Sequence, residues 1–313
     1  MKKLILALLF LLPNAAMALP TAKYTILVVD EQGVPIEGAD ASISFMRPKS
    51  DGWGGKPSFV AGKTDKDGLY TGQGATQQYG VYGASAKGYY GTSFKYNGFT
   101  GVSGIFGFRK WQPWNPTLKV VLKKIKNPIP MYAYNTDRIT IPKNNEIIGY
   151  DLVKHDWVSP YGKGITKDFL FKLEYLPGEK DSNDRYFTMS FSNKADGIQS
   201  FENKESNGSS FRSAYHALIS GYRNAIKQSR VWKKGRPVSS YNEGDGTNYY
   251  FRVRCDGDKP DSCLYGKIYG NLEFGNKGVR FKYFLNPTQG DTNVEFDPKR
   301  NLFKKLKNKI TTP

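Results

Sequence analysis

Few side chains in this sequence have the types and spacing of a familiar catalytic site. His155 and His216 are its two histidines, so a zinc-binding H-E-x-x-H pair is absent, and no G-x-S-x-G nucleophile motif occurs. His155 could form a small site with Asp151 and Asp156, although a lone histidine in a loop is more often a hydrogen-bonded surface group. His216 flanks an apolar stripe, which favours a partly buried structural role. We therefore expect neither zinc nor serine hydrolysis, and we predict no metal site and no cofactor.

Paired carboxylates leave one enzymatic alternative open. Glycoside hydrolysis needs two acids roughly 5 to 10 Å apart, and sequence spacing does not show that separation. The nominal candidates are Asp151, Asp156, Glu174 and Glu295. The alternative function is thus a carboxylate-dependent hydrolase that acts on a cell-wall or polysaccharide substrate.

The segment KTDKDGLY contains an aspartate–glycine loop that could be a calcium site or a tight turn. Asp65 and Asp67 precede Gly68, and Leu69 and Tyr70 at once resume a strand pattern. An EF-hand loop instead spreads oxygen ligands over about twelve residues and ends in a bidentate glutamate. We expect a turn in which Gly68 is left-handed and Asp65 binds local backbone. Calcium held with a carboxylate from a distant loop is the alternative.

The two cysteines lie close together in the segment FRVRCDGDKPDSCLYGKIYG. The residues before Cys255 alternate as in a β-strand, and turn-forming residues follow Cys255. A strand pattern resumes after Cys263. This pattern predicts a hairpin whose loop is closed by a Cys255–Cys263 disulfide. Such a bridge adds about 2 to 3 kcal/mol and needs an oxidising compartment. Metal binding by the pair would need further thiol or imidazole ligands, and none follows at zinc-finger spacing.

Aromatic, glycine and basic residues are interspersed in KYNGFTGVSGIFGFRKWQPWNP. Aromatic faces stack on sugars or bases, and basic groups bind phosphate or carboxylate. We predict a ligand-binding surface formed by Phe108, Arg109, Lys110, Trp111 and Trp114. The alternative is that these rings fill the core of a domain or the seam between two domains.

The first residues, MKKLILALLFLLPNAAMA, have the basic start, short apolar core and small-residue end of a secretory signal peptide. Cleavage is expected between Ala18 and Leu19, which leaves an exported protein in the periplasm or outside the cell. The formal net charge of the full sequence is +18, with 46 Lys and Arg against 28 Asp and Glu. An exported basic protein meets anionic envelope polymers before nucleic acid, so nucleic acid is not an expected partner.

The elements that must position these residues are mostly strands. In the first half, Ala41, Ile43 and Phe45 alternate with serines, and Leu118, Val120 and other apolar residues alternate with lysines. Several short strands separated by turn signals predict a β-sandwich. A stiff connector with Pro128 and Pro130 follows. We place the signal peptide at 1–18, the sandwich at 19–126 and a second domain at 127–313.

The phrases VVDEQGVPIEGADASI, TDKDGLY and AKGYY resemble the carboxypeptidase regulatory-like, or transthyretin-like, domain. The resemblance covers roughly residues 23–124 and implies a Greek-key β-sandwich that serves as an accessory or interaction module. The sequence departs from the family at residues 49–55 and 94–114. The resemblance transfers no catalytic residue.

In the second half too, apolar side chains recur at every second position, for example at Phe169, Phe171, Leu173 and Tyr175. The phrases KNPIPMYAY, GYDLVKHDWVSPYGKG and EFDPKRNLF resemble an uncharacterised segment of exported bacterial proteins, which implies domain layout and no activity. Two helices are expected here. A central amphipathic helix has the apolar stripe Phe211, Tyr215, Leu218, Tyr222 and Ile226, with Ser209 or Ser210 as its cap.

The second helix expected in this half is basic and lies at the C-terminus. Asp297 is its cap and Pro298 its first residue, and Leu302, Phe303, Leu306 and Ile310 form its apolar stripe. This stripe could dock on the second domain or lie on an anionic membrane, and we favour docking. The sequence thus predicts a mainly β fold, with an N-terminal β-sandwich and a β-rich α+β second domain.

The predicted function is non-catalytic recognition of an anionic or carbohydrate component of the cell envelope. The hydrolase described above is one alternative. A module that binds or inhibits another envelope protein through the same aromatic surface is the other.

Overall fold

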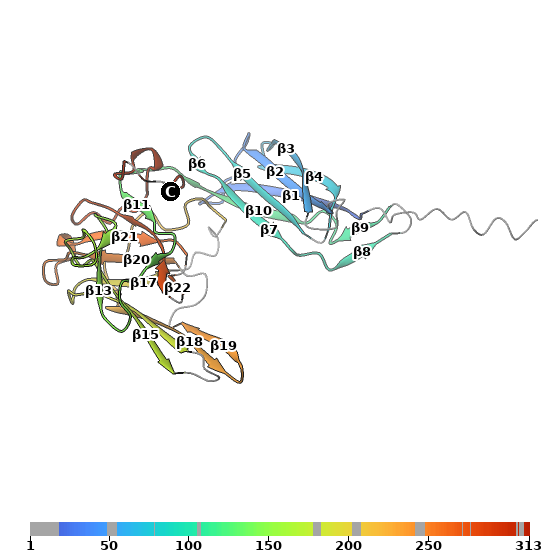
Figure 1. Cartoon of the computed structure of the whole chain (residues 1–313). Coiled ribbons are helices and arrows are strands. Elements are labelled where there is room, and N and C mark those ends of the chain that lie inside the picture. Colours follow the sequence, from blue (N-terminus) through green and yellow to red (C-terminus); the bar gives the residue numbers. More distant parts are fainter. Residues whose placement is uncertain are drawn as a thin grey trace, which may run out of the picture. The chain divides into compact units, whose positions relative to one another are not determined.

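The structure, a computed structural model, describes residues 19–48, 55–77, 79–104, 108–177, 183–201, 208–241, 248–270, 272–275, 277–304, 306 and 310–313. The predicted signal peptide, including Ala18, lies outside these residues. Two compact units result: Met1–Ile125 with Glu205–Ser210 (unit 1), and Lys126–Lys204 with Phe211–Pro313 (unit 2). Strands dominate both units (Figure 1), so the mainly β prediction is confirmed. No helix in the described part is long and apolar enough to cross a membrane.

Unit 1 contains two sheets that share one core. The first has β1 at its centre, between the parallel β10 and the antiparallel β4. Its strands are β1 (Thr21–Asp30), β4 (Leu69–Ala75), β6 (Tyr89–Tyr90), β8 (Gly101–Ser103), β9 (Lys110–Gln112) and β10 (Thr117–Lys124). The second has the order β3-β2-β5-β7 and contains β2 (Asp40–Pro48), β3 (Gly55–Lys63), β5 (Gly80–Ser85) and β7 (Thr92–Tyr96).

The alternating residues of β1 and β2 form this core, as period-2 patterning requires. Tyr24, Ile26, Ile43 and Phe45 are almost completely buried, and the rings of Tyr24 and Phe45 stack at 5.7 Å. Residues 208–210, which come from far along the chain, also belong to unit 1. There Gly208 accepts a hydrogen bond from the backbone N–H of Ser93 on the outer edge of β7.

The aspartate–glycine loop forms the predicted turn. The Asp65 carboxylate accepts hydrogen bonds from the backbone N–H groups of Asp67 (3.0 Å) and Leu69 (2.8 Å). Gly68 has a φ of +72°, and a Cβ there would lie 2.5 Å from the carbonyl oxygen of Val28. The turn therefore requires glycine at this position, and Asp65 is occupied by local backbone.

Unit 2 is built on three sheets, and Figure 1 labels several of their strands. The five-stranded sheet contains β11 (Tyr132–Asn135), β24 (Lys282–Leu285), β21 (Leu264–Ile268), β20 (Asn248–Val253) and β17 (Gly197–Phe201), in that order. The six-stranded sheet contains β14 (Asp156–Trp157), β13 (Ile148–Asp151), β15 (Phe169–Pro177), β16 (Asn183–Ser190), β18 (Ala225–Lys233) and β19 (Arg236–Tyr241). The small sheet contains β12 (Ile139–Thr140), β23 (Gly278–Arg280) and β22 (Glu273–Phe274).

Aromatic rings fill the core of unit 2. Phe169 contacts Phe251 at 5.1 Å and Phe281 at 5.9 Å between ring centroids, and all three are buried. The edge-to-face contact between Phe169 and Phe251 is favourable beyond the area it buries. The strand pattern that the sequence shows from Phe169 to Tyr175 is therefore explained by one shared core.

The predicted central helix is wrong. Its residues form an irregular extended segment followed by β18, and Leu218, assigned to the apolar stripe, is 57% exposed. The backbone N–H groups that a helix would bond internally are bound by distant tyrosines instead. The Tyr269 hydroxyl accepts from Arg212 at 3.2 Å, and the Tyr250 hydroxyl accepts from Ala214 at 2.8 Å. Because these acceptors satisfy the backbone, the segment gains nothing from a helical ladder.

The predicted C-terminal helix does not form in the described residues either. Asp297 does cap a turn by accepting from the Lys299 N–H, but this turn is a 3₁₀ helix limited to Pro298–Arg300. The residues after it are extended or irregular where the structure describes them. Ile310 is nevertheless buried in a cluster with Met131 and Phe296, so the segment docks on unit 2 as expected, without a helix.

Candidate functional site

The predicted aromatic residues of unit 1 differ in what they pack against. Trp111 lies on β9, stacks on the buried Phe99 at 5.0 Å, and donates from Nε1 to the backbone oxygen of Thr76 at 3.0 Å. Trp111 therefore belongs to the edge of the sandwich core. Phe106, another ring of the same aromatic segment, lies outside the described residues.

The other residues of the predicted surface are exposed or half-buried. Phe108 is 80% exposed, and the Lys110 ammonium lies 4.8 Å from the centre of the half-buried Trp114 ring. Arg109 is half-buried, and its carbonyl accepts a hydrogen bond from the N–H of Thr21. The structure thus brings Lys110 and Trp114 into contact, with Phe108 exposed two residues before Lys110. We name Phe108, Arg109, Lys110 and Trp114 the Trp114 surface.

The candidate acid Asp151 is occupied by backbone. Its Oδ1 accepts from the N–H groups of Val153 and Lys154, and its Oδ2 accepts from those of Ile165 and Thr166, at 2.9 to 3.0 Å. Burial raises the pKa of Asp151, but these four hydrogen bonds outweigh it and hold the pKa below its ordinary value. A carboxylate with four such bonds is fixed as an anion and connects two loops.

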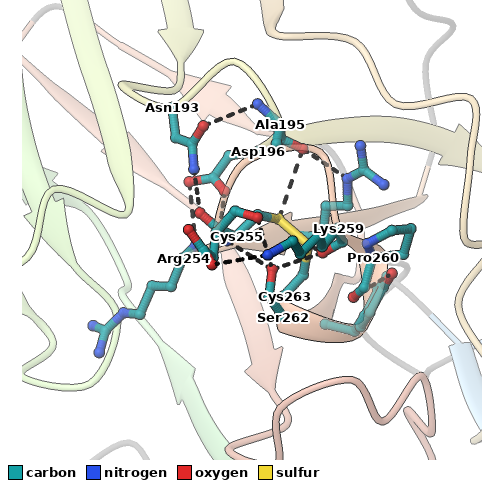
Figure 2. The surroundings of a disulfide bond; sticks show 12 residues. Asn193, Ala195, Asp196, Arg254, Cys255, Lys259, Pro260, Ser262 and Cys263 are labelled. Carbon is teal, nitrogen blue, oxygen red and sulfur yellow. Dashed lines mark hydrogen bonds and ion pairs between the residues drawn. A yellow bond between two sulfur atoms is a disulfide. The ribbon is translucent and has the colours of Figure 1, made fainter.

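Two further buried acids surround the disulfide loop. Arg254 forms a bidentate ion pair with Asp168, and the hydrogen bond to Asp168 raises the pKa of the guanidinium. Asp196 accepts from the backbone N–H groups of Arg254 (3.2 Å) and Cys255 (3.0 Å). Figure 2 shows that the Arg254 side chain points away from the Cys255–Cys263 bond, whose S–S length of 2.03 Å confirms the predicted disulfide.

The other nominal acids also have structural partners. Glu295 accepts from the N–H groups of Lys126 (2.8 Å) and Asn127 (2.6 Å) at the start of unit 2. Asp156 binds the N–H of Lys163 at 2.8 Å. Glu174, at the surface, pairs with Lys172 at 2.7 Å. Each of these acids holds a chain segment or a neighbouring side chain in place.

The histidines do not assemble a site among the described residues. The His155 ring lies between Tyr134 (5.0 Å) and Phe303 (5.1 Å), and no hydrogen bond joins it to Asp151 in this part of the chain. His216, expected to be partly buried, is exposed, because the helix that would have turned it inward does not form. Its Nδ1 lies 3.1 Å from the Thr292 hydroxyl.

Unit 2 also contains a pocket that the sequence did not indicate. Its volume is about 410 Å³, and it is lined by Asn144, Asn145, Tyr175, Asn183, Arg185 and Lys277. We name it the Arg185 pocket. Tyr175 was recognised as the end of an alternating strand, but nothing in the sequence places it beside Lys277. The available signal was the switch from phenylalanine and leucine to tyrosine at the end of that strand.

No protein-family model and no curated relative matches this sequence. Among solved structures, a streptococcal ancillary pilin aligns over 84% of this chain, with 12% identity and a TM-score of 0.19, and the chain spans 58% of that protein. A provisionally assigned carbohydrate-binding protein from Bacteroides uniformis aligns over 84% of this chain and 96% of its own, with 11% identity and a TM-score of 0.19. A variant of the shaft pilin SpaA from Lactobacillus rhamnosus GG aligns over 88% and 95%, with 10% identity and a TM-score of 0.20. TM-scores this low assign neither a fold family nor a function to the chain.

Proposed function

We propose that this chain is an exported, non-catalytic recognition protein that binds an anionic or carbohydrate polymer of the cell envelope. The observation that carries the proposal is the Trp114 surface, where the Lys110 ammonium lies 4.8 Å from the Trp114 ring and the nearby Phe108 is 80% exposed. Exposed rings stack on the apolar faces of sugars, and an adjacent cation attracts carboxylate or phosphate groups.

Charge and compartment support the same function. The sequence has a net charge of +18, which favours association with polyanions. The disulfide between Cys255 and Cys263 is typical of proteins outside the cytoplasm. The acids that a hydrolase would need accept hydrogen bonds from backbone or pair with a neighbouring cation, as Asp151 and Glu295 illustrate.

The test is binding of the chain from Leu19 onward to an immobilised acidic polysaccharide, compared with its neutral counterpart. Trp114→Ala and Lys110→Gln should each weaken binding to the acidic polymer about tenfold, which corresponds to about 1.4 kcal/mol. Phe59→Ala, which removes a ring that is 69% exposed on β3, and Lys87→Gln, which removes an exposed cation, are the matched controls and should bind like the unaltered chain. Binding of all variants should weaken as salt is raised.

Three results would overturn the proposal. Equal losses of affinity in Trp114→Ala and Phe59→Ala would show that any exposed ring contributes equally to polymer binding. Shortened polymer in the bound fraction would favour the hydrolase alternative. Retention of a single envelope protein, with no retention on either polysaccharide, would favour a protein-interaction module.

A further inference from the structure

One face of the strands β15, β16 and β18 changes from apolar to basic along its length. Leu173 and Phe187 lie opposite each other on this face and are completely buried. Two residues further along, Tyr175 lies opposite Arg185, and Arg185 lies opposite Arg230. Because side chains alternate between faces with period 2, these residues continue the face that forms the core. Figure 1 shows β15, β18 and β19 extending together from unit 2, and the basic row lies on this extension.

A loop closes one side of this basic row. The backbone N–H of Asn145 donates to the carbonyl of Leu173 at 2.9 Å, and the Asn145 Oδ1 accepts from the N–H of Tyr175 at 3.2 Å. These bonds attach the loop to β15. The attachment lies past Phe171, where the pairing of β15 with β13 ends. On another side, the Lys277 carbonyl accepts from the N–H of Ile141 at 2.9 Å. The walls of the Arg185 pocket are therefore held by backbone hydrogen bonds.

Two polar atoms of the residues that line this pocket have no hydrogen-bond partner in the described part of the chain. The Tyr175 hydroxyl and the Arg185 Nε are both buried from solvent and form no hydrogen bond with any described residue. An unsatisfied buried polar atom costs about 1 to 3 kcal/mol, so a native protein rarely keeps two at one place without a ligand. Burial raises the pKa of Tyr175, so its hydroxyl remains a donor at neutral pH. Both orphaned atoms are donors and require an acceptor oxygen.

The charges of the pocket agree with that requirement. Arg185 and Lys277 form no ion pair with any described residue. Arg230 does not line the pocket but lies opposite Arg185 on β18, and among the described residues its side chain forms a hydrogen bond only with the Ser239 hydroxyl, at 3.4 Å. Two arginines opposite each other on adjacent strands repel, and an anion between them would offset that repulsion. Asp184 does not fulfil this role, because it lies on the opposite face of β16 and accepts the N–H of Trp232.

We infer that the Arg185 pocket is a second binding site, for a single sugar residue that carries a carboxylate or phosphate group. Arg185 and Tyr175 donate to the oxyanion, Lys277 adds a positive charge, and the amides of Asn144 and Asn183 are placed to bind sugar hydroxyls. The volume of about 410 Å³ is suited to a small ligand and lies in the range of about 300 to 1,000 Å³ typical of such sites. This inference goes beyond the proposed function, which uses unit 1, and it does not depend on the Trp114 surface.

The test is calorimetric titration of the chain from Leu19 onward with four probes: glucuronate, glucose 6-phosphate, glucose and inorganic phosphate. We expect saturable binding of glucuronate, glucose 6-phosphate or both, at least tenfold tighter than glucose and than bare phosphate. The stronger of the two identifies the anionic group. Arg185→Gln should weaken this binding at least tenfold, whereas Arg236→Gln, which alters an exposed arginine on β19, should leave it unchanged. Trp114→Ala should also leave it unchanged, which separates this site from the proposed polymer-binding surface.

Tyr175→Phe provides a second variant that keeps the packing. It removes only a hydroxyl that has no partner, so the melting temperature without ligand should stay the same or rise, while affinity falls severalfold. A lower melting temperature without ligand would show that the hydroxyl already has a partner and would overturn the inference. Absence of saturable binding to both anionic sugars, or equal binding by Arg185→Gln and Arg236→Gln, would also overturn it.

Discussion

Arg254 and Asp168 form a bidentate ion pair in which Nε lies 2.7 Å from Oδ1 and Nη2 lies 2.8 Å from Oδ2. The side chain of Asp168 is completely buried and that of Arg254 is 30% exposed. Asp168 also accepts the backbone N–H of Leu152 at 2.9 Å, and Arg254 directly precedes the disulfide loop. The pair therefore connects the end of β20 to the loops around β13.

Removal of the arginine should destabilise the protein strongly. Arg254→Met leaves the buried Asp168 carboxylate without its counter-ion, and we expect the free energy of unfolding to fall by about 3 to 5 kcal/mol. In the double variant Arg254→Met/Asp168→Asn, the amide oxygen still accepts the Leu152 N–H and residue 168 no longer carries a buried charge. Asp151 loses its 3.3 Å contact with the guanidinium but keeps its four backbone hydrogen bonds. The double variant should be more stable than the single one. Urea denaturation measures both, and a double variant as unstable as Arg254→Met would contradict this account.

The backbone of Arg254 allows a second comparison. Its φ is +57°, a left-handed conformation that costs a residue with a Cβ about 1 to 2 kcal/mol. Both Arg254→Ala and Arg254→Gly lose the ion pair, but only glycine relieves the backbone strain. We expect Arg254→Gly to be more stable than Arg254→Ala by about 1 kcal/mol in urea denaturation. The usual order, in which alanine is the more stable, would show that the conformation is not strained.

Asp151 should make stability depend on pH in a defined direction. Its folded-state pKa is below the ordinary value of about 3.9, so it contributes stability above that pH and loses it as pH falls through the folded-state pKa. Asp151→Asn cannot titrate and should be less stable at neutral pH. The difference in unfolding free energy between the two proteins should therefore narrow from about pH 5 downward. A difference that stays constant to pH 2 would contradict the role given to the four backbone N–H groups.

The disulfide should contribute a moderate amount of stability. Cys255 and Cys263 are separated by eight positions, and a loop of this size predicts about 2 to 3 kcal/mol from the restricted unfolded chain. Cys255→Ala/Cys263→Ala should unfold at correspondingly lower urea concentration. Reductant should lower the stability of the unaltered protein and leave the double variant unchanged. If the reductant lowered the stability of both proteins, its effect would not come from reduction of this disulfide.

The features predicted correctly from the sequence depend on neighbours along the chain. The Asp65–Gly68 turn needs only local hydrogen bonds, and the disulfide joins two strands of one hairpin. The central helix failed because its apolar spacing matched a helical period, while the acceptors for its backbone, such as the Tyr269 hydroxyl, come from another strand. The Arg185 pocket was missed for a similar reason, since sheet register and loop docking bring Tyr175, Arg185 and Lys277 together.

Trp111 and Trp114 should respond differently to substitution. Trp111 packs on Phe99 and donates to the Thr76 carbonyl, so Trp111→Ala should lower the free energy of unfolding by about 2 to 4 kcal/mol, somewhat less than for a fully buried ring. Trp114 contacts the Lys110 ammonium at the surface, so Trp114→Ala should change stability by about 0.5 kcal/mol or less. Thermal and urea unfolding measure both variants, with Phe59→Ala as an exposed-ring control. If Trp114→Ala proved as destabilising as Trp111→Ala, Trp114 would belong to the core. Weaker polymer binding by Trp114→Ala would then no longer support a recognition surface.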